Sequence, residues 1–145
     1  MSVKYFNEDV PFPKLTRRII TNWIKETIRL EEKVIGDISF IFCSDDYLLE
    51  VNKKYLTHDY YTDIITFDYV ENGIINGDIF ISTDRVKENA IQFSITFEDE
   101  LNRILIHGVL HLLGYKDKIK EDKTLMTFKE NYYLNVLKIS SLIQN

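Results

Sequence analysis

The stretch HGVLHLLGYKD, residues 107 to 117, is the most informative part of this chain. His107 and His111 are four residues apart, and residues at that spacing share one face of an α-helix, so both imidazoles can reach one metal ion. Gly114 can then end the helix, because glycine accepts the left-handed backbone conformation found at helix ends. Three further residues can bring the Asp117 carboxylate back toward the histidines. The stretch therefore predicts an open metal site with His107, His111 and Asp117 as ligands.

The helix that carries the histidines is expected at about residues 97 to 113, capped by Thr96 and apolar over most of its circumference, as in a central buried helix. The apolar patterns on either side predict strands at 3 to 8, 37 to 44, 64 to 71 and 75 to 82, and helices at 14 to 32, 45 to 56, 84 to 94 and 120 to 140. Gly36 is expected to precede the second strand, and Asn72 and Gly73 suit a hairpin turn.

These elements mix without strict strand–helix alternation, which indicates the α+β class. We expect a single domain, 1-145, with a small mixed β-sheet of about four strands packed with about five helices around the metal-binding helix. A chain of 145 residues can bury a sizeable core without disulfides, and the lone cysteine, Cys43, cannot form one internally.

Composition limits the partners and the compartment. A net charge of −5 argues against a general nucleic-acid coat, so any RNA contact must be local. The N-terminus lacks the basic and then apolar pattern of a signal region, and no long uncharged apolar run occurs. We therefore expect a soluble, cytoplasmic protein with no membrane partner.

Four segments together resemble one family. The segment HGVLHLLGYKD is similar to the HGxLHLxGYDH signature of the YbeY family of bacterial rRNA-maturation endoribonucleases. NKKYLTHDYYTDIITF (52 to 67) resembles that family's NxxYRxxDxPTDVLSF, NGDIFIS (76 to 82) its LGDIxIS strand, and EDELNRILIHG (98 to 108) the approach to the metal helix. Such an ordered set is far more specific than an isolated HxxxH.

The chain departs from the family pattern at two positions. Asp117 stands where the family has a third histidine, which gives a His/His/Asp site with a formal charge about one unit lower. Leu56 stands where the family has an arginine suited to phosphate recognition. Lys53, Lys54 or His58 can supply a replacement group at that place.

The resemblance implies a metal-dependent, single-strand-specific endoribonuclease that acts in rRNA maturation and ribosome quality control. One divalent ion, zinc by preference, would hold the attacking water, since zinc with three protein ligands keeps a fourth position open. The implied partners are rRNA or the ribosomal small subunit and assembly proteins. The predicted RNA contacts are Lys53, Lys54, Lys116 and Lys118, although lysines at a helix start are commonly just solvated.

Two other functions compete with this interpretation. The spacing HxxxHxxGxxD also occurs in metzincin-like proteases, but Gly108 replaces the glutamate that those enzymes use as general base. The other alternative is a non-catalytic ribosome-assembly factor whose metal only ties the helix end to the loop; an open fourth metal position would argue against it. Thr62 and Asp63 are expected to brace a loop. The general base, the RNA site cleaved, the metal in vivo and the oligomeric state do not follow from the sequence.

Overall fold

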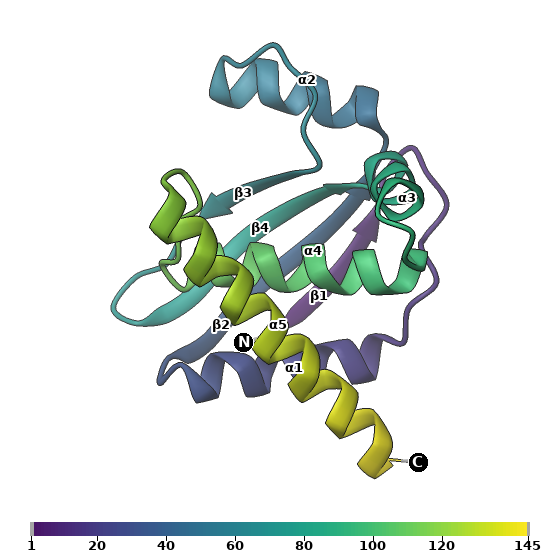
Figure 1. The fold of residues 1–145 in the computed structure, drawn as a ribbon. Coiled ribbons are helices and arrows are strands. Elements are labelled where there is room, and N and C mark those ends of the chain that lie inside the picture. The colour runs from purple at the N-terminus through teal and green to yellow at the C-terminus, as the bar shows by residue number, and fades with distance from the viewer. Residues whose placement is uncertain (1, 145) are drawn as a thin grey trace.

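The fold is built on a four-stranded mixed sheet, seen in a computed structural model that describes residues 2–144 (Figure 1). The elements in chain order are β1 (Val3–Asn7), α1 (Arg17–Leu30), β2 (Val34–Cys43), α2 (Asp45–Leu56), β3 (Ile64–Asp68), β4 (Ile74–Ser82), α3 (Thr83–Gln92), α4 (Phe97–Leu112) and α5 (Lys120–Gln144). The strand order is β1-β2-β4-β3, with β1, β2 and β4 parallel and β3 antiparallel to β4. The α+β class and the hairpin of the last two strands are thus confirmed.

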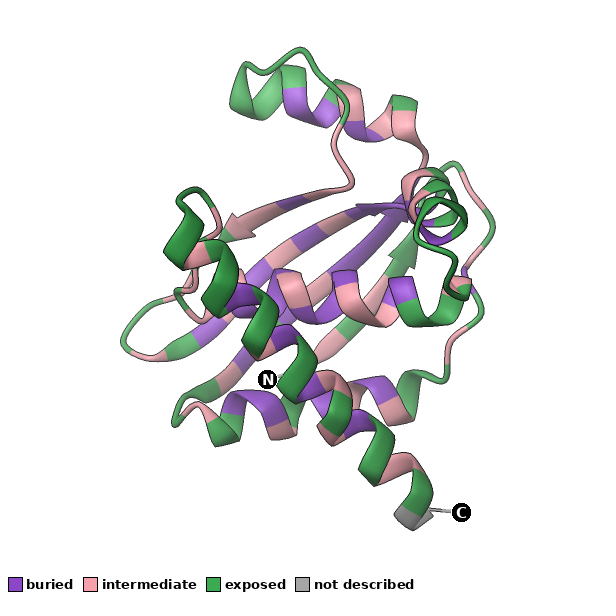
Figure 2. Cartoon of the chain, viewed as in Figure 1, coloured by how far each residue is buried: buried purple, intermediate pink, exposed green. Residues whose placement is uncertain are grey.

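The two faces of the sheet carry different helices. Ile79 and Ile81 of β4 belong to the main core together with buried residues of α1, α4 and α5. Side chains alternate along a strand, so Phe80 points to the other face, where it packs with Leu48 and Val51 of α2. Helix α4 is buried along most of its length, and α5 lies across it with a narrower buried stripe (Figure 2).

Two glycines let α4 approach the sheet closely. A Cβ atom at Gly108 would come within 2.9 Å of Ile79 Cγ2, and one at Gly77 would come within 2.7 Å of a Leu112 methyl group. Real Cβ atoms do not approach other atoms this closely, because protein interiors are already close-packed. The glycine after the first histidine therefore fixes the depth at which the histidine-bearing helix sits.

The element boundaries differ from the sequence-based expectation in a few places. Strand β2 starts at Val34 and passes through Gly36, which lies at an irregularity of the β2–β4 pairing between Ile35 and Ile38. The prediction that Gly36 lies before the second strand is therefore wrong. The strand continues through Gly36 because residues before it, up to Ile35, and residues after it, from Ile38, both pair with β4. Within residues 2–144, no helix combines the length and the apolar character that a membrane crossing requires.

Candidate metal centre

Helix α4 ends as the sequence predicts. Gly114 has φ +101°, and its N–H donates to the His111 carbonyl oxygen at 3.0 Å while Tyr115 N–H donates to the Leu110 carbonyl oxygen at 3.0 Å. This pair of hydrogen bonds is the Schellman motif, which closes a helix with a residue in the left-handed region. The chain then turns back along the helix end and brings Asp117 to the two histidines.

The three predicted ligands meet at one point. The Nε2 atoms of His107 and His111 lie 3.0 Å apart, and Asp117 Oδ2 lies 3.2 Å from the first and 3.4 Å from the second. A tetrahedral site with bonds of 2.0–2.1 Å has ligand atoms about 3.3–3.4 Å apart. The triangle thus has nearly the size that zinc or a similar ion requires, and no other group of three such ligand atoms is found among the described residues.

The opposite side of each imidazole is also engaged. His107 Nδ1 lies 2.6 Å from Glu130 Oε2, and His111 Nδ1 lies 3.0 Å from the Tyr115 carbonyl oxygen. Both partners accept hydrogen bonds, so each Nδ1 carries a proton, and in the neutral form of each ring Nε2 keeps its lone pair for a metal. The donor set and its supporting contacts therefore fit a divalent ion.

Glu130 of α5 is a site residue that sequence reasoning missed. It is buried, and its second oxygen accepts a hydrogen bond from Arg103 Nη1 at 2.8 Å. Burial lowers the pKa of His107, but the hydrogen bond and charge of Glu130 outweigh it, and the net shift is upward. The pKa of His111 falls, first through burial and then through the neighbouring His107 charge. The sequence signal that could have found Glu130 is its spacing: it lies on the same helix face as Met126 and Tyr133, which are buried, so a carboxylate was to be expected among core residues there.

A second contact chain supports the turn after α4. Glu31, at the end of α1, accepts hydrogen bonds from the hydroxyls of Tyr115 and Tyr133 and from Lys129 Nζ. Tyr115 is the residue whose backbone carbonyl faces His111. The end of α1 therefore helps to hold the peptide that orients the second histidine.

Asp63 lies in the electrostatic neighbourhood of the site. Burial raises the pKa of its carboxyl, while the charge of His107 acts in the opposite direction and that of Asp117 adds to the rise. Its backbone carbonyl accepts a hydrogen bond from Ser82 N at 3.0 Å. This contact is made by the backbone, so the bracing role expected for the Asp63 side chain stays a prediction, and its half-buried carboxyl adds an acidic group near the site.

A cleft of about 520 Å³ opens beside His111. His111 and Lys118 line it, together with Leu56 at the end of α2 and with His58 and Tyr60 of the loop that follows. The site therefore borders open space, which argues against a sealed structural metal. Leu56 occupies the wall where the family pattern has arginine.

The four lysines predicted to contact RNA are not equivalent. Lys118 borders the cleft, whereas Lys116 is exposed in the same loop. Lys53 Nζ lies 3.5 Å from an oxygen of Asp59, and Lys54 Nζ lies over the Tyr55 ring at 5.2 Å. Neither α2 lysine lines the cleft, so both stay predictions without a position beside the metal ligands.

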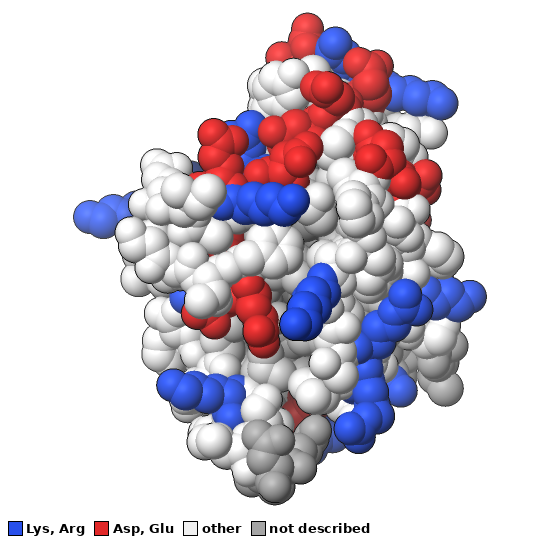
Figure 3. All heavy atoms as spheres, turned by 90° about the vertical axis from the view of Figure 1, so that its right-hand side faces the viewer, with Lys and Arg blue, Asp and Glu red and all other residues white. Residues whose placement is uncertain are grey.

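Charge is unevenly distributed over the surface. Acidic side chains gather toward α2 and α3 on the face drawn in Figure 3, and basic side chains lie mainly lower on that face. Asp45, Asp46, Asp84 and Glu88 belong to these two helices. A phosphate backbone is therefore repelled from the acidic part of this surface.

The fold and the site define a small α+β protein with a two-histidine, one-carboxylate centre beside a cleft, the arrangement of a metal-dependent hydrolase. The family model described as Endoribonuclease YbeY matches residues 3–138. The chain belongs to the YbeY family.

Relatives and a solved structure agree with this assignment. Proteins named Endoribonuclease YbeY from Parabacteroides distasonis and Bacteroides fragilis are 47% and 48% identical to it over 137 and 138 residues. These matches cover 94% and 95% of this chain and 96% and 99% of the two relatives. The solution structure of TM1509 from Thermotoga maritima superimposes with a TM-score of 0.68 at 26% identity, covering 99% of this chain and 93% of that one.

Proposed function

We propose that this protein is a metal-dependent endoribonuclease that cleaves single-stranded RNA during rRNA maturation and ribosome quality control. The convergence of His107, His111 and Asp117 beside an open cleft is the observation that carries the proposal. Membership of the YbeY family supplies the activity class, since the relatives bear the name endoribonuclease. The processing of rRNA takes place in the bacterial cytoplasm, so a cytoplasmic location accompanies the proposal.

One zinc ion is the proposed occupant, with Nε2 of each histidine and one Asp117 oxygen as its ligands. A divalent ion bound there would acidify a water molecule and polarise a phosphodiester oxygen. The protein's own groups hold the imidazoles in the metal-binding tautomer through Glu130 and the Tyr115 carbonyl. Lys118, which borders the cleft, would attract the phosphate, and the exposed Lys116 would add a weaker, screened attraction.

Two features of position 108 argue against the metzincin-like protease: the general base is missing there, and the backbone leaves no room for a side chain. A glutamate at position 108 would supply the missing base, but a side chain there would collide with Ile79 of the sheet. An experiment can distinguish the non-catalytic assembly factor from the endoribonuclease, because the assembly factor would bind metal and associate with the ribosomal small subunit without cleaving RNA.

The test compares one RNA sequence as a single strand and as a duplex. Zinc-loaded protein should cleave the single strand, a chelator should stop cleavage, and added zinc should restore it. Alanine variants of His107, His111 and Asp117 should each lose bound metal and activity together. If Asp117→Ala kept full metal stoichiometry and affinity, the His/His/Asp assignment would be wrong; a metal-loaded protein that cuts neither RNA would favour the assembly factor.

A further inference from the structure

Two of the aromatic residues in the loop between α2 and β3, His58 and Tyr60, line the cleft. His58 and Tyr60 are stacked, with ring centroids 5.1 Å apart and an interplanar angle of 24°. The Tyr60 hydroxyl also lies 3.1 Å from His58 Nδ1. Both residues line the cleft that contains His111 and Lys118, and Tyr60 is 56% exposed.

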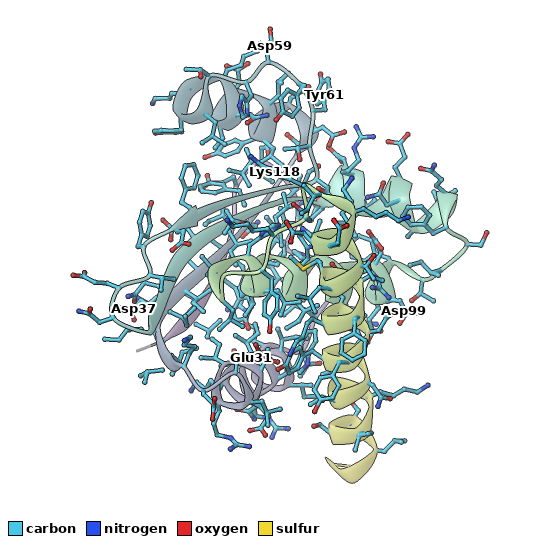
Figure 4. All side chains as sticks on the ribbon, turned by 60° about the vertical axis from the view of Figure 1, so that its left-hand side comes forward. Glu31, Asp37, Asp59, Tyr61, Asp99 and Lys118 are labelled. Carbon is cyan, nitrogen blue, oxygen red and sulfur yellow. The ribbon has the colours of Figure 1, made fainter. Side chains whose placement is uncertain are left out.

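This loop is held in place although its rings face solvent. The buried Asn52 donates from Nδ2 to the Tyr60 carbonyl oxygen at 2.9 Å. Tyr61 donates from its hydroxyl to Asp46 Oδ1 at 3.1 Å, and Figure 4 shows Tyr61 and Lys118 at the same end of the molecule. Backbone and side-chain bonds to α2 thus fix the base of the loop, so little ordering of its backbone is needed when a ligand stacks on the Tyr60 ring.

We propose that the His58–Tyr60 pair is a stacking platform for a nucleobase of the single-stranded RNA substrate. The ligand chemistry follows from the cleft walls. The lining of the cleft sets two conditions: His58 and Tyr60 offer an aromatic surface for a base, and Lys118 offers a cation for a phosphate near one metal ligand, His111. A nucleotide with its base on Tyr60 and its phosphate toward Lys118 meets both conditions.

The platform also discriminates against duplex RNA. Bases inside a duplex have both faces covered by their neighbours, so stacking on a protein ring requires unpairing and unstacking first. A free strand offers its bases without that cost. Position 61 of this chain is tyrosine where the family pattern has proline, and position 60 is not specified by that pattern, so the platform belongs to this chain's own sequence.

The proposal rests on the proposed function for its ligand, and its test measures binding without cleavage. Metal-loaded protein is titrated with fluorescent 2′-O-methyl hexanucleotides, whose integrity is checked afterwards. One strand carries every base, and the others carry a single abasic position moved along the strand. Anisotropy should show that the most sensitive abasic position weakens binding to the wild type by about tenfold.

Variants decide whether the ring of Tyr60 is responsible. Tyr60→Ala should bind the complete strand about tenfold more weakly and lose the abasic penalty, whereas Tyr60→Phe should keep both affinity and penalty. Tyr132, 49% exposed on α5 and outside the cleft, provides the control, and Tyr132→Ala should behave as wild type.

Three results would overturn the platform. They are an equal abasic penalty in wild type and Tyr60→Ala, a Tyr60→Phe variant as weak as Tyr60→Ala, and no measurable binding of the complete strand by the wild type. A wild type that shows the abasic penalty but cleaves no RNA would leave the platform supported and refute the proposed endoribonuclease function.

Discussion

Replacing Glu130 by glutamine should weaken metal binding by about 10- to 100-fold, because partners that orient a ligating imidazole are typically worth that much. The substitution keeps the shape of a buried side chain but removes its negative charge. The single amide oxygen can accept from either His107 Nδ1 or Arg103, which in the wild type lie 2.6 and 2.8 Å from the two carboxylate oxygens, and it brings no negative charge to either bond. The loss corresponds to about 1.4–2.7 kcal/mol of binding free energy.

The same change should lower the free energy of unfolding of the metal-free protein by about 1–2 kcal/mol, because Arg103 loses a charged partner while remaining partly solvated. Competition with a chromogenic chelator measures metal affinity, and urea unfolding measures stability. Glu121→Gln is the control, since Glu121 is exposed in the first turn of the same helix.

Arg103→Gln separates the two effects. It removes the cation and leaves the Glu130–His107 contact, so stability should fall while metal affinity changes by less than about threefold. If Glu130→Gln lost stability but bound metal as tightly as wild type, Glu130 would serve packing and its ion pair alone, and the argument for imidazole orientation would fail.

Gly108→Ala should cost about 1–3 kcal/mol of unfolding free energy, because its Cβ would meet Ile79 Cγ2 at 2.9 Å; a thermal midpoint equal to wild type would contradict this. Gly114→Val should cost more than about 1 kcal/mol and weaken metal binding, since φ is +101°; unchanged urea midpoints and affinity would count against it. Burial raises the pKa of Glu31, but its hydrogen bonds outweigh this and lower it below 4.5, so its stabilisation is complete above about pH 4.5 and is lost as pH falls through the lowered folded value. The stability difference between wild type and Glu31→Gln should therefore shrink in acid, and a pH-independent difference from urea titrations would refute the assignment. Asp117→His raises the site's charge by about one unit and should move the rising limb of the pH–rate profile to lower pH at fixed salt; an unmoved limb with metal bound would argue against a metal-activated water.

The sequence by itself determined two parts of this protein whose residues are close together in the chain: the metal-ligand segment and the β3–β4 hairpin. The i, i+4 spacing of His107 and His111 places both on one helix face, and Gly114 ends that helix, so the convergence with Asp117 follows from eleven consecutive residues. Period-two alternation and the Asn72-Gly73 turn likewise determined the β3–β4 hairpin.

Tertiary structure decided what lies around those ligands. Glu130 reaches His107 from 23 positions away, and Glu31 reaches Tyr115 from 84 positions away, through the packing of helices whose relative placement no local pattern encodes. The passage of β2 through Gly36 depended on its pairing with β4. Sequence specifies a site directly when the chain between its groups is short and stiff, whereas groups on separate elements meet only where core packing fixes the distance between those elements.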